Sequence, residues 1–305
     1  MINNYVVKLI DNLPDNVKNA KKPLHLDLVL DGGLFNGSYL VGALYFLKEM
    51  ERRNIIKIDR ISGCSVGSII ALLYFTDNLD MITKIYEMVK NDFTNTRYLS
   101  ILKNFKTILN DKMPDNVCDI VNKKLFISYY NVVKNTKRVK SSYNSFDNII
   151  NTMIRSSFIP YLIDGNLIYE NKYIDGLTPY IFKIKSNVKI LYLDLFGYDK
   201  LNNLFNIKNE KTNYHRILSG LLDIHIFFIK QTNTQMCSYV NDWNVRDKFL
   251  NYFKFIIEKI CISIVYLLFI LKKYFPTNCK DMLLFKILSK ISNEIFILFV
   301  DAYCL

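Results

Sequence analysis

The sequence predicts an α/β fold built around a mainly parallel central sheet. Twice in the first quarter of the chain, a short apolar segment ends in a glycine turn and a helical segment follows it. Successive strand, turn and helix units are typical of parallel sheets, because each helix returns the chain to the edge where the next strand begins. Half of the 305 residues are hydrophobic, so the chain can bury a large core.

The first unit follows a polar leader, residues 1–22. Residues 25–30 alternate and then run apolar, as in a buried strand that ends at Gly32 and Gly33. Residues 38–53 then carry apolar side chains on one side and end in charged ones, which predicts a helix.

The second unit repeats this arrangement. Residues 58–62 predict a short strand, and residues 65–75 predict an apolar helix after a tight turn. Six of the ten glycines of the chain fall between positions 32 and 67, so we infer that this part needs unusual backbone conformations.

Further elements follow in the same order along the chain. Residues 80–123 indicate a helical cap or insertion over the sheet, and residues 125–142 indicate two strands joined by a turn. A helix is predicted near residues 147–157, then a strand that leads to Asp175, and then a buried strand over residues 188–196.

Residues 206–305 are predicted to form a helical, hydrophobic C-terminal region that packs on the main domain, residues 23–205, or on a membrane. The mainly apolar run at residues 260–271, which contains Ser263, is 12 residues long, whereas a membrane-spanning helix needs roughly 20. A buried or interfacial helix is therefore expected rather than a transmembrane span.

The formal net charge of +12 favours an anionic partner, such as a nucleic acid, a phospholipid surface or an acidic substrate. Lys and Arg are spread along the chain, and no run reaches the density of a nucleic-acid-binding arm. We therefore expect a peripheral membrane surface as a partner, and no nucleic acid.

The six cysteines form no CxxC pair and show no zinc-like spacing with the three histidines. They are expected to be free thiols in a reducing compartment, without a structural metal. The apolar run at the N-terminus is too short for the core of a secretion signal. These features predict an intracellular, cytoplasmic protein.

The turn of the second unit, GCSVG at residues 63–67, fits the pattern G-x-S-x-G. A serine between a strand and a helix adopts strained backbone, so small residues two positions before and after it avoid clashes while the hydroxyl is held out at the edge of the sheet. Ser65 is therefore a candidate nucleophile. The alternative is an ordinary connection in which Ser65 caps the helix.

A nucleophilic serine needs a base. A histidine triad would use a histidine late in the chain, but neither His215 nor His225 follows a convincing strand, and His25 has no motif around it. Asp175, in YIDG at a strand end, can accept the proton instead if burial raises its pKa. A lone Asp-Gly is usually a turn, so Asp175 gains its value only in combination with Ser65.

Three ordered motifs together resemble the patatin-like phospholipase family over residues 26–179, about half of the chain. They are DGGLFNG at residues 31–37, GCSVG, and DGL at residues 175–177, which follows IRSSFIPYLIDGNLIYENKYI. In that family, D-G-G-G-x-[RK]-G supplies oxyanion donors and G-x-S-x-G carries the nucleophile. D-G-[GA] carries the aspartate of a Ser-Asp dyad that works without histidine.

The resemblance implies a three-layer α/β/α patatin-like fold and hydrolysis of acyl esters of lipids. Ser65 would attack the ester carbonyl, Asp175 would take its proton, and the amides of Gly32, Gly33 and Leu34 would face the oxyanion. The resemblance also assigns supporting glycines to the motifs, namely Gly37, Gly63, Gly67 and Gly176. It implies no metal or other cofactor, although some relatives respond to calcium or to protein activators.

Three residues depart from the family pattern. Leu34 replaces the third glycine, Asn36 replaces the basic residue, and Leu177 follows Asp-Gly. The Leu34 amide can still donate if its φ is negative, whereas a positive φ would be costly for leucine. Loss of the basic residue affects rate and headgroup preference more than the class of reaction.

Three functions stay open at this point. The first is a phospholipase A-like lipid acyl hydrolase that uses Ser65 and Asp175. The second is a non-catalytic lipid-binding or membrane-binding protein, which a Leu34 side chain filling the oxyanion site would favour. The third is a histidine-triad hydrolase, which requires His215 or His225 beside Ser65. The choice of lipid, and of water or another acyl acceptor, depends on the shape of the pocket.

Overall fold

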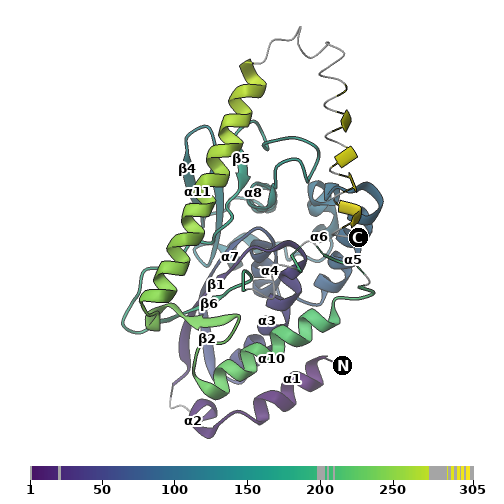
Figure 1. The fold of residues 1–305 in the computed structure, drawn as a ribbon. Coiled ribbons are helices and arrows are strands. Elements are labelled where there is room, and N and C mark those ends of the chain that lie inside the picture. Colours follow the sequence, from purple (N-terminus) through teal and green to yellow (C-terminus); the bar gives the residue numbers. More distant parts are fainter. Residues whose placement is uncertain are drawn as a thin grey trace.

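One mixed sheet organises the fold (Figure 1). The structure is a computed structural model, and it describes residues 2–19, 22–197, 203–204, 206–208 and 210–274, with separate positions between 287 and 302. Within these residues the strands are β1 (Leu24–Leu30), β2 (Ile56–Cys64), β3 (Leu125–Asn131), β4 (Thr136–Lys140), β5 (Tyr173–Asp175), β6 (Lys189–Leu193) and β7 (Cys237–Tyr239). Their order is β4-β3-β2-β1-β6-β7, and β5 pairs with β3.

The centre of the sheet is parallel, as the two strand, turn and helix units predict. β1 lies between β2 and β6 and runs parallel to both, and β2 runs parallel to β3. The outer strands β4 and β7 and the short β5 are antiparallel to their neighbours. Because Leu30 at the end of β1 pairs with Gly63 near the end of β2, the loops after both strands leave the same edge of the sheet.

One face of the sheet is covered by the helices α3 (Gly37–Arg52), α4 (Val66–Phe75), α8 (Phe146–Ser157) and α10 (Tyr214–Lys230). Leu28, Ile61 and Leu191 point from that face into the core that these helices share. α10 crosses α3 very closely, since a Cβ added at Gly42 would lie 1.9 Å from the carbonyl oxygen of Ile217.

The stretch expected to be a polar leader contains the amphipathic helix α1 (Ile2–Asp11), followed by the short α2 (Asp15–Lys18). Val6, Leu9 and Ile10 lie on one side of α1 and are buried in the main core. Apolar residues three and four positions apart share one side of a helix. The apolar side of α1 therefore packs on the main domain.

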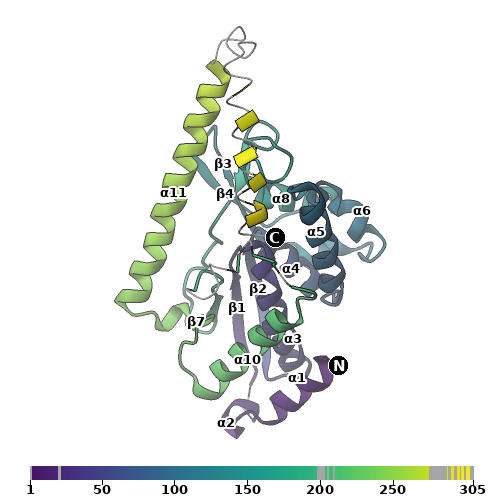
Figure 2. The ribbon, with the colours of Figure 1, turned by 45° about the vertical axis from the view of Figure 1, so that its right-hand side comes forward.

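Residues 80–123, called the cap segment below, contain a group of short and long helices (Figure 2). It comprises α5 (Met81–Thr96), η2 (Ser100–Asn104), α6 (Phe105–Asn110) and α7 (Val117–Val121). Ile82, Ile85 and Phe105 are buried in the main core, and Tyr86 and Phe93 join a second cluster with Phe35. The cap segment therefore packs against the elements that follow β1 and β2.

The C-terminal region contains helices and also one strand, β7, which pairs with β6. The region expected to be helical therefore also adds one strand to the sheet, because the chain that leaves α10 returns along the open side of β6. The short η3 (Val240–Asp242) leads on to α11 (Val245–Tyr274). α11 covers part of the opposite face, where Ile262 packs with Tyr130 and Ile174, so helices flank the sheet on both sides. None of the helices within the described ranges is long and apolar enough to cross a bilayer.

Candidate active site

Ser65 occupies the sharp turn between β2 and α4. Its φ is 50° and its ψ is −130°, a conformation that non-glycine residues rarely adopt, and only 5% of the residue is exposed. Such backbone strain costs about 1–3 kcal/mol and persists only where the surrounding packing enforces it. The turn holds Ser65 at the edge of the sheet where the loops after β1 and β2 emerge.

The glycines on both sides of Ser65 are required by close backbone packing. A Cβ added at Gly63 would lie 2.6 Å from the carbonyl carbon of Gly67. A Cβ added at Gly67 would lie 2.6 Å from the carbonyl oxygen of Asp31, at the end of β1. The two glycines therefore let the first turn of α4 approach β1, which brings Ser65 beside the loop that follows that strand.

Ser156, at the end of α8, fixes the backbone of the turn. The Ser65 amide donates a hydrogen bond to Ser156 Oγ over 2.9 Å, and Ser156 Oγ donates to the carbonyl oxygen of Ser128 over 2.6 Å. The Ser65 amide is thus satisfied within the fold. The sequence alone does not predict this contact, because it depends on how α8 packs on β3.

Asp175 ends β5, and the Ser65 side chain lies close enough to its carboxyl group to affect the pKa of that group. Burial raises the pKa of Asp175 from 3.8 to about 7, although the hydrogen bond from the Leu177 amide and the nearby Ser65 side chain act in the opposite direction. A Cβ added at Gly176 would lie 2.9 Å from the carbonyl oxygen of Ser128, so glycine allows this close approach to β3. The fold thus brings Ser65 and Asp175 together from separate motifs.

The loop after β1 lies directly against Ser65. A Cβ added at Gly32 would lie 3.2 Å from the Cβ of Ser65. Within the described part of the chain, no group accepts a hydrogen bond from the amides of Gly32, Gly33 or Leu34. Unpaired amides beside a nucleophile are the donors that an oxyanion requires.

Leu34, which begins η1 (Leu34–Asn36), has a positive φ of 43°, the backbone conformation that is costly for leucine. The left-handed conformation costs an L-residue about 1–2 kcal/mol. The Leu34 side chain packs against the cluster that contains Phe35 and Phe158. Apolar packing therefore opposes the backbone strain at the position where the family pattern has glycine.

Asn36, which stands where the family pattern has a basic residue, is contacted by a buried arginine. Arg216 Nη1 of α10 donates to Asn36 Oδ1 over 2.7 Å, and Arg216 Nη2 donates to Glu210 Oε1 over 2.6 Å. The next residue, Gly37, lets α3 approach α4, since a Cβ there would lie 2.5 Å from Val66 Cγ2. A guanidinium thus reaches this loop from 180 positions away, which no local pattern could predict.

Asp31, the residue before Gly32, is fully buried, and burial raises its pKa from 3.8 to about 7. The Tyr192 hydroxyl donates to Asp31 Oδ2 over 3.1 Å. Lys254 of α11 donates to the same oxygen over 3.3 Å and lies 2.8 Å from Asp194 Oδ2. These contacts connect the loop after β1 to α11. The sequence alone does not predict these contacts, because Tyr192 and Lys254 belong to no motif.

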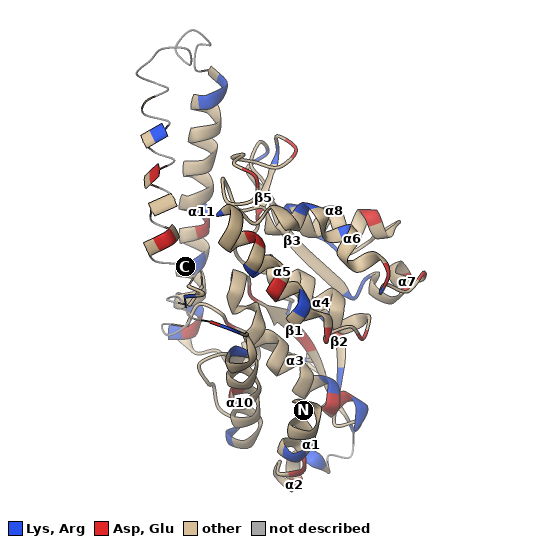
Figure 3. Ribbon diagram, turned by 90° about the vertical axis from the view of Figure 1, so that its right-hand side faces the viewer, with Lys and Arg blue, Asp and Glu red and all other residues tan. Residues whose placement is uncertain are grey.

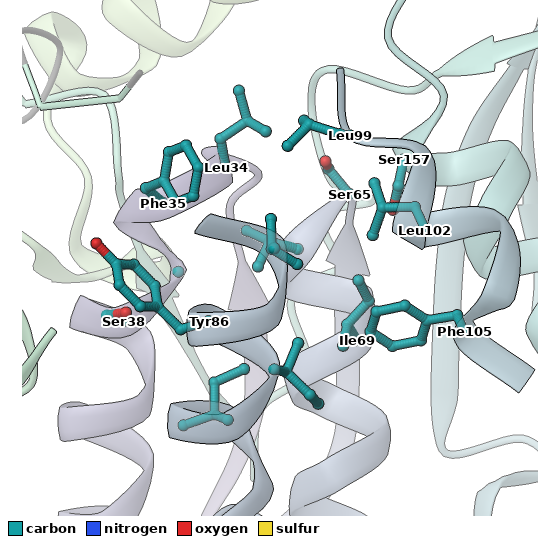
Figure 4. Close-up of a pocket in the computed structure, with 15 residues that line it drawn as sticks. Leu34, Phe35, Ser38, Ser65, Ile69, Tyr86, Leu99, Leu102, Phe105 and Ser157 are labelled. Atoms are coloured by element: carbon teal, nitrogen blue, oxygen red, sulfur yellow. The ribbon is translucent and has the colours of Figure 1, made fainter. Parts of the chain in front are cut away.

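A narrow apolar pocket of about 60 Å³ borders Ser65 (Figure 4). Its apolar lining comes from η1, α4 and the cap segment and includes Leu34, Phe35, Val66, Ile69, Ile82, Ile85, Tyr86, Val89, Leu99, Leu102 and Phe105. Ser65 and Ser157 lie at the same end of the pocket, and the Ser157 hydroxyl has no partner among the described residues. The pocket is therefore mainly apolar, and the hydroxyls of Ser65 and Ser157 lie near each other in its lining.

The histidines lie away from Ser65, which overturns the histidine-triad hypothesis. Each has another neighbour: His25 contacts Asp59, His215 contacts Glu210, and His225 packs edge-on against Phe46. In the described part of the chain, no group of three or more His, Cys, Asp or Glu side chains could hold a metal ion.

The chain is similar to proteins of one known family. The model of that family, described as patatin-like phospholipase, matches residues 28–194. The 1-acylglycerol-3-phosphate O-acyltransferase Pnpla3 of Mus musculus is 26% identical over 154 residues, which are 47% of this chain and only 37% of the mouse protein. The crystal structure of VipD from Legionella pneumophila covers 55% of this chain and 49% of its own, with 13% identity and a TM-score of 0.32.

The family match extends over the loop after β1, the serine turn and the Asp175 motif, and over more than half of the chain. It confirms the resemblance that the three ordered motifs indicated. The sheet with helices on both faces confirms the three-layer α/β/α fold that the resemblance implied. The chain therefore belongs to the patatin-like phospholipase family, a lipid-acting family.

Proposed function

We propose that the chain is a lipid acyl hydrolase, of the phospholipase A type, in which Ser65 is the nucleophile and Asp175 is the base. The observation that carries the proposal is that the Ser65 side chain interacts with a buried carboxyl group whose pKa is about 7. A base with a pKa near neutral pH is ionised often enough to accept a proton and basic enough to take it.

The reaction has two steps. Ser65 Oγ attacks the ester carbonyl while Asp175 takes the hydroxyl proton, and the oxyanion forms beside the amides of Gly32, Gly33 and Leu34. The intermediate collapses, Asp175 returns the proton to the departing alcohol, and the acyl group stays on Ser65. Asp175 then takes a proton from water, which attacks the acyl-enzyme. When the bond between the acyl group and Ser65 Oγ breaks, Asp175 returns that proton to Ser65 Oγ, and the fatty acid is released.

The pocket supports a substrate with an apolar acyl chain. Its lining is mainly apolar, with the hydroxyls of Ser65 and Ser157 near each other and Ser38 and Tyr86 on the other side. An acyl chain in this pocket would bring its ester group to the hydroxyls of Ser65 and Ser157, and the free Ser157 hydroxyl can donate to an ester oxygen. An alcohol that replaced water in the second step would give acyl transfer, the activity that the name of the mouse relative states.

A non-catalytic lipid-binding protein is the second candidate, and Leu34 is the observation that favours it. The Leu34 side chain lines the pocket beside Ser65, where the family pattern has no side chain. In that case the protein binds acyl lipid and releases no product.

The test is release of fatty acid from phospholipid vesicles by the full chain and by two variants, Ser65→Ala and Asp175→Asn. We expect both variants to lose release, and an active-site-directed fluorophosphonate to label Ser65. Ser219→Ala and Asp111→Asn, at exposed positions, are matched controls. Full release by either dyad variant would overturn the dyad, and no release by the wild type would favour the lipid-binding protein.

We also propose that residues 23–205 form the catalytic domain with its cap at 80–123, and that the protein works in a reducing, cytoplasmic compartment. The described cysteines support the compartment because Cys64, Cys118 and Cys261 are free thiols. Cys279 and Cys304 lie outside the described residues. Loss of activity under reducing conditions, or secretion of the chain by its natural host, would contradict this proposal.

A further inference from the structure

Helix α11 turns a partly polar side toward the body of the protein and an apolar side away from it. An inner stripe is buried or half-buried and consists of Asn251, Lys254, Glu258, Ile262, Val265 and Phe269. An outer stripe consists of the residues two positions after each inner residue, namely Phe253, Ile256, Ile260, Ile264, Leu267 and Leu271. Two residues along a helix correspond to a rotation of about 200°, so the two stripes lie on opposite sides.

The polar half of the inner stripe has charged and polar partners in the body. Lys254 pairs with Asp31, beside the candidate oxyanion loop. Glu258 is 1% exposed, lies 3.1 Å from Lys137 Nζ and accepts a hydrogen bond from Thr178 Oγ1 over 2.5 Å. Rotating α11 would leave these buried charges unpaired, which is strongly unfavourable. The orientation of the helix is therefore fixed, with its outer stripe facing away.

The outer stripe is exposed along the whole helix. Its six side chains are between 38% and 57% exposed. A surface helix of a globular protein normally turns its apolar side toward the core. In α11, by contrast, the charged Lys254 and Glu258 face the core and the apolar outer stripe faces away. Figures 1 and 2 show α11 along one side of the molecule, extending beyond β4 and β5. A large exposed apolar surface marks an interaction site.

We propose that α11 lies in the interface of an anionic lipid bilayer, with its outer stripe among the acyl chains. The choice of a lipid partner rests on the proposed function. The charge of the helix supports it, because α11 carries six Lys or Arg residues and two Asp or Glu residues. Figure 3 shows basic residues at its last turn, Lys272 and Lys273. Apolar side chains combined with Lys and Arg are typical of interfacial helices that bind anionic lipid.

Two observations favour a bilayer over a second copy of the chain. Large apolar side chains also stand beside the outer stripe, since Tyr252, Ile257 and Leu268 are exposed. The apolar arc is therefore wider than the narrow seam by which two helices pair. A net charge of +12 also repels a second copy, whereas it attracts anionic lipid.

The test measures binding to vesicles by the full chain with Ser65→Ala, so that turnover plays no part. Vesicles of phosphatidylcholine are compared with vesicles that also contain phosphatidylglycerol. We expect stronger binding to the second kind, and we expect Ile260→Ser with Leu267→Ser to weaken that binding at least about tenfold. The matched control is Ile184→Ser with Leu218→Ser, two exposed apolar residues outside α11.

A second measurement does not depend on removing apolar side chains. With Ile264→Trp, brominated lipid should quench the added fluorescence, whereas Ile184→Trp should show no such quenching. Absence of vesicle binding, or equal binding by the outer-stripe and control variants, would overturn the proposal. So would a dimer in light scattering that only the outer-stripe variant dissociates. Vesicle binding without fatty-acid release by the wild type would retain this proposal and overturn the hydrolase.

Discussion

Lys254 of α11 donates a hydrogen bond to the buried carboxyl group of Asp31 over 3.3 Å, across 223 positions of the chain. Asp31 directly precedes Gly32, so the contact joins the C-terminal helix to the loop that borders Ser65. Lys254 also lies 2.8 Å from Asp194 Oδ2, after β6. One ammonium group therefore offsets the charges of two carboxyl groups at the end of two neighbouring strands.

Removing that ammonium group should destabilise the fold in a pH-dependent way. In Lys254→Met, ionised Asp31 loses its cation, which costs about 3 kcal/mol for a buried pair. The loss in unfolding free energy should be larger at pH 8 than at pH 5, because burial raises the pKa of Asp31 to about 7 and the group is mostly neutral at pH 5. Denaturant unfolding of Lys254→Met and of the exposed control Lys248→Met measures this, and equal losses at both pH values would contradict it.

Stability should fall as pH rises through about 7. The pKa values of Asp31 and Asp175 are raised from 3.8 to about 7 in the folded protein, mainly by burial. The folded state therefore binds these protons more tightly than the unfolded state does, and the stabilisation is fully present below pH 4 and lost above pH 7. Urea unfolding from pH 4 to pH 8 should show this slope, and Asp31→Asn should flatten it. An unchanged slope in Asp31→Asn would show that other groups cause it.

Unlike stability, activity should increase as pH rises through about 7. Asp175 must be ionised to take the proton of Ser65, and its pKa is about 7. The value of kcat/KM for a soluble activated ester should therefore rise through about pH 7 and level off above it. Asp111→Asn, at an exposed site, should keep the same profile. A flat profile between pH 5 and pH 9 would argue against Asp175 as the base.

Glycine at position 34 should be better tolerated than alanine. Both substitutions remove the packing of the leucine side chain, but only glycine relieves the strain of a φ of 43°. Leu34→Gly should therefore be about 1 kcal/mol more stable than Leu34→Ala. At Leu99, where φ is −105°, the same comparison should favour alanine. Denaturant midpoints for the four variants decide the matter, and the reverse order at position 34 would disprove the assigned strain.

The crossing of α3 and α10 should not tolerate a side chain at either of its glycines. A Cβ at Gly42 would lie 1.9 Å from the Ile217 carbonyl oxygen, and a Cβ at Gly220 would lie 1.9 Å from the Tyr39 carbonyl oxygen. Because backbone must move, Gly42→Ala and Gly220→Ala should each lower the unfolding free energy by about 3 kcal/mol. Ser219→Ala, exposed on α10, should change it by under about 0.5 kcal/mol. A neutral effect at Gly42 would mean that the helices lie farther apart.

Local patterns in the sequence were enough to predict the parallel core and the serine turn. The strands and helices of the two units follow from alternation and helical spacing within each segment. The turn at Gly63, Ser65 and Gly67 follows from steric limits over five residues. Asp175 could be paired with Ser65 only through the resemblance to a family, because a lone Asp-Gly carries little information. The six glycines between positions 32 and 67 serve two purposes. Gly63 and Gly67 allow the serine turn, whereas Gly42 allows α3 to pack closely on α10 and has no part in the site.

Tertiary structure alone decided the electrostatics around those motifs. Arg216 reaches Asn36, and Lys254 reaches Asp31, from helices 180 and 223 positions away, so no local spacing encodes either contact. The raised pKa of Asp175 likewise depends on how completely β3, β5 and their neighbours exclude water. The physical reason is the range of the interactions: backbone sterics and periodicity act over a few residues, whereas burial and charge pairing depend on segments that meet only when the chain has folded.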